Sequence, residues 1–265
     1  MHATVVLAYH NRLSQLAFTM RTISMSDYPD VDVIIVDDTG EPKIDEITST
    51  YPFPVRVIRP AGLKTWHNPC IAFNTGFAYA KGDVIITNQC ECCHRGDVIS
   101  RMMQLVDDSI YVSCQVYAAS EEQTRRMHEV PTDKSLNAWI DECVPKVPGE
   151  PDWAHNRNGW WNHEIYRPMK YHWVAAITRA NLEKMKGFDE RFANGWWFED
   201  NDFVDRSARL GLQCVINTDA DVYAVHQYHP EFSMDYDKVE VNRGVYAITS
   251  LEPSCEAKHN TVYNP

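Results

Sequence analysis

The sequence has no excess of basic residues and no long hydrophobic run. Its 25 lysines and arginines stand against 37 aspartates and glutamates, which gives a formal net charge of −12. Such a surface repels phosphate backbones and anionic lipids, so general binding to nucleic acid or to a membrane surface is disfavoured. Arg125-Arg126 is the only pair of adjacent basic residues. A local basic pocket is compatible with this sequence, but an extended basic surface is not.

The sequence also predicts neither a secretory leader nor a membrane span. No charged segment followed by an apolar stretch and a cleavage site opens the sequence, and no run of about 18 apolar residues occurs. We therefore expect a soluble cytoplasmic protein, free or peripheral to a membrane, with eight free thiols. Cys90, Cys92, Cys93 and His94 lack the paired-cysteine spacing of structural zinc sites, so buried thiols are favoured there over zinc.

Strands and helices are expected to alternate over the first hundred residues. Residues 4–9, 31–36, 55–58 and 84–87 are short apolar runs, typical of parallel strands that are covered on both faces. Helical spacing occurs between them, in residues 13–23, 44–51 and 71–80. These βα units predict an α/β fold with a Rossmann-like, mostly parallel sheet flanked by helices, and ligands beyond the carboxyl ends of its strands.

The middle of the chain has a different pattern. Residues 118–168 are rich in charge and proline and show little periodicity, so we expect an irregular insertion there. Strand-like or helical patterns resume at 171–178, 182–185, 202–210 and 213–217. The last thirty-odd residues carry few core signals and should form a tail packed over the domain. A length of 265 residues suits one large domain with an insertion.

Polar residues follow three of the expected strands and open a later helix. The sequences are AYHNR at 8–12, DD at 37–38, NQCE at 88–91 and EDND at 199–202. Because the carboxyl ends of neighbouring parallel strands meet at one edge of a sheet, we expect the first three groups to converge on one crevice.

At this point the sequence resembles the family 2 glycosyltransferases of the GT-A fold, over roughly residues 4–230. The resemblance is carried by VVLAYHNR…VDVIIVDDTG, by FNTGFAYAKGDVIITNQCE and by GFDERFANGWWFEDNDFVDRSARLG, in that order. It implies a single GT-A domain over residues 1–265. Its parts would be a nucleotide-sugar-binding half (1–117), an acceptor-binding half (118–230) and a C-terminal tail (231–265).

One motif departs from the family pattern. Gln89-Cys90-Glu91 stands where the family usually has Asp-x-Asp, whose carboxylates hold Mn²⁺ or Mg²⁺ against the donor diphosphate. Glu91 keeps an oxygen ligand, whereas Gln89 offers only a carbonyl or a hydrogen bond to the donor ribose or sugar. The resemblance implies His226 as a further ligand, with His229 as a close competitor. Metal binding without donor should be weak, and an enzyme that needs no metal stays an alternative.

The resemblance also implies the catalytic base. Sugar transfer with inversion needs a base within reach of the attacking hydroxyl, opposite the leaving group. The family's base is the acid after Glu in its x-Glu-Asp motif, which is Asp200 here. Glu199 would bind an acceptor or sugar hydroxyl, and Asp202 would cap or orient the helix. The alternative is that Glu199 and Asp200 are ordinary acidic residues at a helix N-terminus.

Donor contacts are assigned by the same resemblance to Tyr9, Arg12, Asp38, Asn74 and Gln89. Asp38 matches the acid that contacts the base or ribose. For Asp37, Arg12 and Asn68 the alternative is hydrogen bonding within loops and turns.

Aromatic residues indicate the acceptor side. Seven of the eight tryptophans lie in the second half, at 139, 153, 160, 161, 173, 196 and 197. Indole rings pack on the C–H faces of sugars. Trp196 and Trp197 adjoin the acid pair, so they are favoured as acceptor-binding residues over Trp160 and Trp161, for which lid anchors or plain core are alternatives.

The leading hypothesis is therefore an inverting glycosyltransferase that uses a nucleotide sugar, UDP-linked by preference, a divalent cation and a carbohydrate acceptor. A retaining enzyme and a non-catalytic sugar- or nucleotide-binding protein remain alternatives. A sugar transferase acting on DNA bases is disfavoured by the net charge. The sequence does not specify the sugar, the acceptor, the linkage or the oligomeric state.

Overall fold

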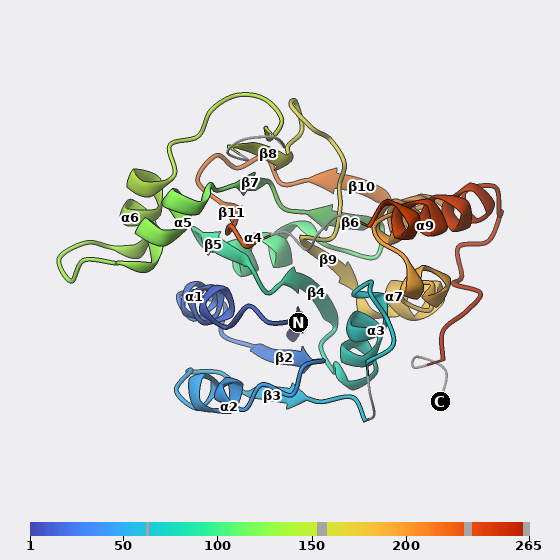
Figure 1. The fold of residues 1–265 in the computed structure, drawn as a ribbon, viewed down its shortest axis with the longest axis horizontal. Helices are drawn as coiled ribbons and strands as arrows, with labels where there is room; N and C mark the ends of the chain where they lie inside the picture. The colour runs from blue at the N-terminus through green and yellow to red at the C-terminus, as the bar shows by residue number, and fades with distance from the viewer. Residues whose placement is uncertain (62–63, 153–157, 231–234, 262–265) are drawn as a thin grey trace.

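The structure is a computed structural model that describes residues 1–61, 64–152, 158–230 and 235–261. Its main layer is a seven-stranded sheet (Figure 1). In spatial order the strands are β10 (Gln213–Ile216), β6 (Ile110–Ser113), β9 (Val174–Thr178), β4 (Val84–Gln89), β1 (Ala3–Tyr9), β2 (Val31–Asp37) and β3 (Val55–Ile58). Neighbouring strands are parallel except β9, which runs antiparallel to β4 and β6. The predicted mostly parallel α/β sheet is confirmed.

Helices cover both faces of this sheet. One face packs against α1 (Leu13–Ile23), α2 (Lys43–Thr48) and α4 (Val98–Leu105), and the other against α3 (Cys70–Tyr79), α7 (Arg179–Met185) and α8 (Glu199–Arg209). In β1, Val5 and Leu7 point to the first layer and Val6 to the second, because side chains alternate along a strand. A Cβ on Gly76 of α3 would lie 2.3 Å from Val6, so glycine permits this helix to sit directly on β1.

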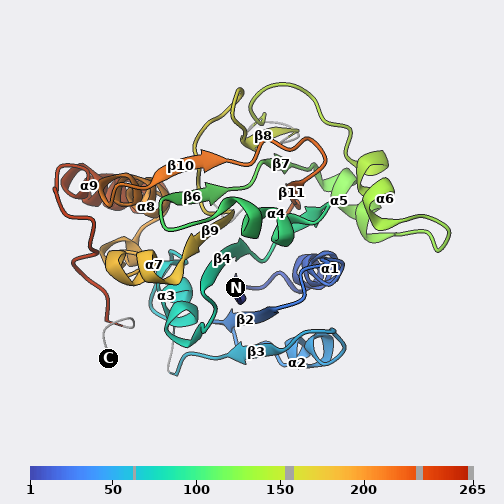
Figure 2. The same ribbon diagram turned by 180° about the vertical axis from the view of Figure 1, so that it is seen from behind.

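A second, four-stranded sheet begins with the strand that follows β4 in the chain. Its order is β5 (Cys92–Arg95), β11 (Tyr223–His226), β7 (Val116–Ala118) and β8 (Gly159–Asn162). Helices α5 (Glu121–His128) and α6 (Leu136–Cys143) lie at its end (Figure 2). The antiparallel pairing of β5 with β11 sets His226 opposite Cys92, one residue after Glu91. A long-range strand pair therefore joins the end of β4 to the histidines that follow β11.

The prediction of irregular structure over residues 118–168 is wrong for α5 and α6. Both helices have only eight residues, and α5 contains few apolar ones, so periodicity did not reveal them. Local capping does specify them. Ser120 and Gln123 form a reciprocal capping box, and the Ser135 side chain accepts a hydrogen bond from the Ala138 N–H. Trp153 lies outside the described residues.

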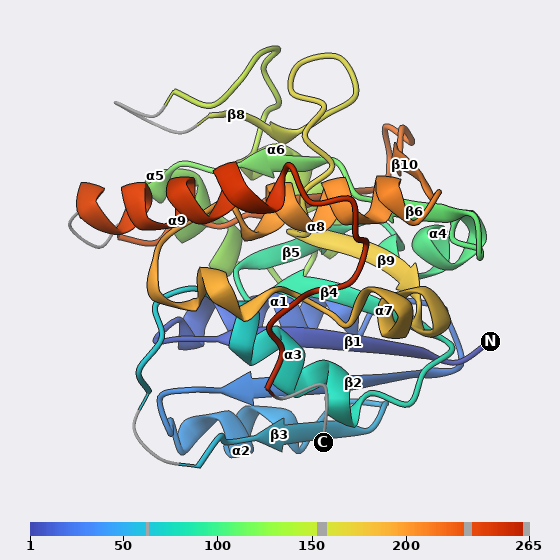
Figure 3. The same cartoon turned by 90° about the vertical axis from the view of Figure 1, so that its right-hand side faces the viewer.

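The C-terminal tail packs on the domain and contains a helix that periodicity also missed. This helix, α9 (Tyr236–Thr249), buries only Val239, Asn242 and Thr249, a face too polar to give a hydrophobic pattern. It lies alongside α8 (Figure 3). The chain then runs to the short 3-10 helix η1 (Glu190–Asn194), where Glu190 N–H donates to the carbonyl of His259.

All eight cysteines are free, as predicted. Burial raises the pKa of the Cys92 and Cys93 thiols, so they are protonated. No helix within the described residues combines the length and the apolar character needed to span a membrane.

Candidate active site

Three strand ends meet where the sequence predicts them. Tyr9 at the end of β1 is in register with Asp37 of β2, and Ala8 is in register with Gln89 of β4. Asn11, just beyond β1, has a positive φ of 51° that turns the chain toward Arg12. The carboxyl edge of the sheet therefore brings the predicted donor segments together.

A cavity of about 720 Å³ opens at this edge. Its walls combine the strand ends, the start of α8 and the segment after β11. Among the predicted residues, the lining includes Arg12, Gln89, Trp196, Trp197, Glu199, Asp200, His226 and His229. Some of the residues assigned to the donor, to the acceptor and to the metal thus line one cavity.

Glu91 lies behind this wall at the centre of a charged cluster. Its Oε1 is 2.6 Å from Nη1 of Arg12, and 3.5 and 3.7 Å from Nε2 of His226 and His229. Burial by itself raises the pKa of the Glu91 carboxyl, but the charge of Arg12, followed by the interaction with His226, outweighs it and holds the pKa well below the usual range. Glu91 is therefore a buried carboxylate ion surrounded by cationic or neutral nitrogen donors.

The acid pair lies at the N-terminus of α8. Glu199 is buried and accepts a 2.6 Å hydrogen bond from Nδ2 of Asn68, whereas Asp200 accepts one of 2.8 Å from the Asn201 N–H. Burial, and then the charge of Glu199, raises the pKa of Asp200 well above its usual range. Burial also raises the pKa of Glu199. Acidic residues that served only the helix dipole would gain no such shift, so these pKa directions favour a functional interpretation of the pair over simple helix capping.

Aromatic rings form the rest of the cavity wall. Trp196 and the half-exposed Trp197 line it as predicted, and Trp161 does so as well. Trp160 instead packs in the core against Tyr117 and Tyr223.

Several lining residues have no counterpart in the sequence prediction. Arg167 lies over the rings of Trp161, Trp173 and Tyr171, at 5.3, 5.7 and 6.0 Å from their centroids. The high proportion of aromatic residues in 160–173 was the one sequence feature that could have predicted that rings from this segment line the cavity. Arg167, by contrast, belongs to no local motif.

Comparison with known proteins decides the family. The sequence profile described as glycosyl transferase family 2 matches residues 4–189, which is more than half of the chain. The chain belongs to glycosyl transferase family 2. A second profile, described as the N-terminal domain of galactosyltransferase, matches residues 173–230, the part that holds Glu199, Asp200, His226 and His229. No curated protein matches the sequence significantly.

Solved structures agree on the GT-A fold. The mannosyltransferase PcManGT from Pyrobaculum calidifontis, in complex with GDP-Man and Mn²⁺, matches 94% of this chain with a TM-score of 0.58 at 15% identity. TarS 1–349 from S. aureus, in complex with UDP-GlcNAc, matches 98% with a TM-score of 0.64 at 14% identity. The chain spans 62% of the first protein and 68% of the second. At these identities the likeness concerns the fold.

Two predicted donor residues of this family 2 chain lie away from the cavity. Tyr9 is 1% exposed in the core, and burial raises its pKa to about 12. Asn74 is fully buried; its amide donates to the Phe188 carbonyl and accepts from the Phe188 N–H. The structure does not bring either side chain to the cavity, because Tyr9 packs in the core on the α1 face of the sheet and Asn74 bonds α3 to the backbone of Phe188.

Asp38 lies at the adjoining edge, at the end of β2. Its carboxylate accepts from Nδ1 of His10 at 2.7 Å and pairs with Nζ of Lys64 at 2.5 Å. Burial raises the pKa of Asp38, but these two partners outweigh it and lower the pKa. Asp37 instead holds the turn at Thr39 and pairs with Arg59, so its role is in the loop.

Glu91, His226 and His229 suit a divalent cation. One donor atom from each lies within 4.8 Å of the others. Burial lowers the pKa of His229 to about 3, and Glu91 is ionised, so both are in the deprotonated state that metal binding needs. Nδ1 of His226 is buried without a hydrogen-bond partner in the described structure. The Cys90–His94 segment forms no comparable group among the described residues.

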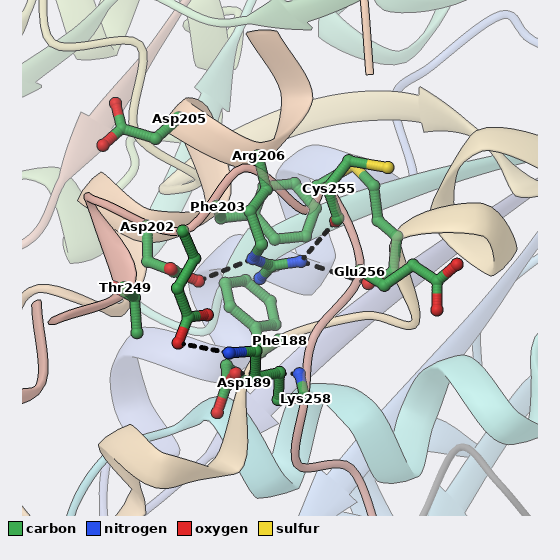
Figure 4. Close-up of polar contacts among 12 residues, drawn as sticks. Phe188, Asp189, Asp202, Phe203, Asp205, Arg206, Thr249, Cys255, Glu256 and Lys258 are labelled. Atoms are coloured by element: carbon green, nitrogen blue, oxygen red, sulfur yellow. Dashed lines mark hydrogen bonds and ion pairs between the residues drawn. The ribbon is translucent and has the colours of Figure 1, made fainter. Parts of the chain in front are cut away.

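Asp202 neither faces the cavity nor caps α8. Its carboxylate pairs with Nε of Arg206 at 2.7 Å, and both side chains are almost fully buried (Figure 4). Arg206 also donates to the carbonyls of Met185, Gly187 and Cys255. This ion pair fixes α8 to α7 and to the C-terminal tail, and so orients the helix that carries the acid pair.

Replacing Arg206 by Met should lower the free energy of unfolding by about 3–5 kcal/mol, because it leaves the buried Asp202 charge unpaired. Urea unfolding followed by circular dichroism measures the change. Arg209→Met, on the same helix but more exposed, serves as the control and should cost less than about 1 kcal/mol. Equal effects of the two substitutions would contradict the structural role given to the ion pair.

Proposed function

We propose that this chain transfers a sugar from a UDP-linked donor to a hydroxyl of a carbohydrate acceptor, with inversion at the anomeric carbon. The observation that carries the proposal is the single cavity in which the ends of β1 and β4, the acid pair of α8 and the histidines after β11 face one another. Nucleotide sugars bind S. aureus TarS and PcManGT, which share the fold. One domain over residues 1–265, with the donor and acceptor halves described above, is part of the proposal.

Asp200 acts as the base in this scheme. It takes the proton of the attacking hydroxyl as the bond to the anomeric carbon forms and the bond to the diphosphate breaks. Its raised pKa makes it a stronger base than an exposed aspartate. Glu199, held by Asn68, accepts from a hydroxyl of the acceptor or the sugar, and Trp196 and Trp197 pack against the sugar faces.

The donor is held on the opposite wall. Arg12 and Gln89 donate to the donor, and Asp38 lies toward the base or ribose. Glu91, His226 and His229 hold a divalent cation, for which Mn²⁺ fits the mixed oxygen and nitrogen donors better than Mg²⁺ does. When bound, this ion neutralises negative charge on the leaving diphosphate.

A thermal-shift screen of nucleotide sugars, with and without Mn²⁺, tests the donor. A true donor raises the melting temperature according to its concentration and affinity. UDP-sugars should do so in the presence of Mn²⁺, and GDP-sugars, included because PcManGT binds GDP-Man, should not. If only GDP-sugars raise the melting temperature, the proposed donor is a GDP-sugar and not a UDP-sugar. No shift and no calorimetric binding with any nucleotide would favour a non-catalytic protein, and the anomeric configuration of the product separates inversion from retention.

The pH dependence of transfer should reveal the ionisation of Asp200. The base works only when ionised, so kcat/KM falls as the pH drops through its raised pKa and levels off above that pKa. Glu199→Gln removes the neighbouring charge and keeps an oxygen for Asn68, so it should move the acid limb to lower pH. Initial rates across the pH range measure both profiles. A wild-type limb at the usual aspartate pKa, or one that Glu199→Gln leaves in place, contradicts the assignment.

A further inference from the structure

Two consecutive residues before the acid pair have left-handed backbone conformations. The φ angles of Trp197 and Phe198 are 64° and 70°. This region is disfavoured for any residue with a Cβ, and here it holds two bulky aromatic residues in succession. Such strain persists only when surrounding contacts enforce it, and it is concentrated at functional sites. Because Phe198 is the N-cap of α8, this turn sets where Glu199 and Asp200 begin the helix.

Helix α9 supplies the contacts that enforce this turn. Asn242 is fully buried, and its Nδ2 donates to the carbonyls of Trp197 at 2.9 Å and of Phe192 at 3.0 Å. The Trp196 N–H donates to the carbonyl of Lys238, also on α9, at 3.1 Å. Helix α9 is therefore hydrogen-bonded both to the backbone of η1 and to that of the left-handed turn.

Close packing and ring stacking further stabilise the contact between α9 and the turn. A Cβ on Gly195 would lie 2.2 Å from Oδ1 of Asn242, so only glycine allows the loop to come so near α9. Phe198 stacks on Tyr246 of α9 with ring centroids 5.7 Å apart, and the Tyr246 hydroxyl donates to Asp205 of α8 at 2.8 Å. Figure 3 shows the C-terminal part of α9 beside α8.

We propose that α9 is a positioning element for the acceptor side of the site, and that Asn242 is its key residue. By holding the strained turn, it sets the direction of Trp197 and of the Glu199–Asp200 pair in the cavity. Helix α9 lies beyond the residues matched by either family profile, 4–189 and 173–230. The kinetic consequence rests on the proposed function, whereas the conformational one does not.

Asn242→Ala tests the conformational claim without any activity. Hydrogen exchange, followed by mass spectrometry, should speed up in peptides covering 195–200 while the strands of the main sheet stay protected. Asn217→Ala is the matched control: Asn217 is also buried and donates to the Val222 carbonyl, but it does not line the cavity. Equal exchange changes around 195–200 in the two variants would overturn the proposal.

Kinetics test the consequence for transfer. Below the melting temperatures of the variants, Asn242→Ala should lower kcat by about 10- to 100-fold, because small misplacements of reacting groups are costly. Its affinity for UDP with Mn²⁺ should match the wild type. A loss of activity no greater than that of Asn217→Ala would reject the positioning role. An absence of transfer by the wild type would instead count against the proposed function, and the exchange result would stand.

A rescue experiment separates positioning from general stability. Glycine adopts positive φ without strain, whereas alanine does not. In the Asn242→Ala background, Phe198→Gly should therefore restore more of kcat than Phe198→Ala does. Both substitutions remove the ring that stacks on Tyr246, so the two double variants differ only in how easily residue 198 adopts a positive φ. If the glycine and alanine double variants are equally impaired, holding the left-handed turn is not what Asn242 provides.

Discussion

Replacing Asp200 by Asn is expected to lower kcat for sugar transfer by about 10³-fold, within the range that a positioned general base contributes. The amide keeps the shape of the side chain and an oxygen for the Asn201 N–H, so the turn at the start of α8 should be preserved. It has no site to take up the proton of the acceptor hydroxyl. Steady-state assays with saturating donor and acceptor measure the loss, and calorimetry with UDP and Mn²⁺ should give wild-type affinity.

Asp205→Asn is the matched control for this prediction. Asp205 lies on the same helix, does not line the cavity and accepts from the Tyr246 hydroxyl, which an amide oxygen can also do. Its kcat should stay within about twofold of the wild type, as is usual for replacements away from a reacting centre. If Asp200→Asn retains near-wild-type transfer, Asp200 is not the base.

Replacing Glu91 by Gln should abolish the response of the protein to Mn²⁺ and reduce transfer by about 10³-fold, a loss that corresponds to several kcal/mol of transition-state stabilisation. The substitution removes the only carboxylate of the Glu91–His226–His229 cluster. It also leaves the Arg12 guanidinium without its ion pair, so circular dichroism must first show that the variant is folded. Electron paramagnetic resonance of free Mn²⁺ measures binding directly, and chelation of the wild type should reproduce the loss of activity.

Nucleotide should strengthen Mn²⁺ binding by the wild type. Arg12 pairs with the same Oε1 of Glu91 that faces the histidines, so a cation bound there would compete with Arg12, and a diphosphate that paired with Arg12 would weaken this competition. Glu183→Gln, at an exposed ion pair on α7, should leave Mn²⁺ binding unchanged. His226→Ala and His229→Ala should each weaken it. If Glu91→Gln binds Mn²⁺ and transfers sugar as the wild type does, the cluster is not the metal site.

The sequence predicted the fold of residues 1–117 well because the signals there are local. Each strand from β1 to β4 is a short apolar run, and the polar residues come directly after it, so parallel packing alone brings them to one edge. The same local reasoning failed for Tyr9 and Asn74. Position in a motif does not reveal whether a side chain points to the crevice or into the core, where both of these lie.

The structure of residues 118–230 depends more on contacts between distant segments. Trp173 and Arg167 reach the cavity through the antiparallel strand β9 and the segment before it, and neither belongs to a motif of its own. Helix α9 was missed because it is anchored by amide and carbonyl groups and by one stacked ring. Hydrogen bonds of this kind do not require apolar residues at helical spacing, so the sequence shows no hydrophobic periodicity there.

The sequence by itself determined the order of the βα units, the α/β class, the polar strand ends and the acid pair Glu199–Asp200, since each is set by residues within a few positions of one another. Only the tertiary structure decided that Glu91 meets two histidines and Arg12 at one point. That meeting depends on the pairing of β5 with β11, and the Gln227 N–H bonds the Glu91 carbonyl at 2.9 Å across it. The register of strands more than a hundred residues apart is fixed by the packing of the whole chain, which no local pattern encodes.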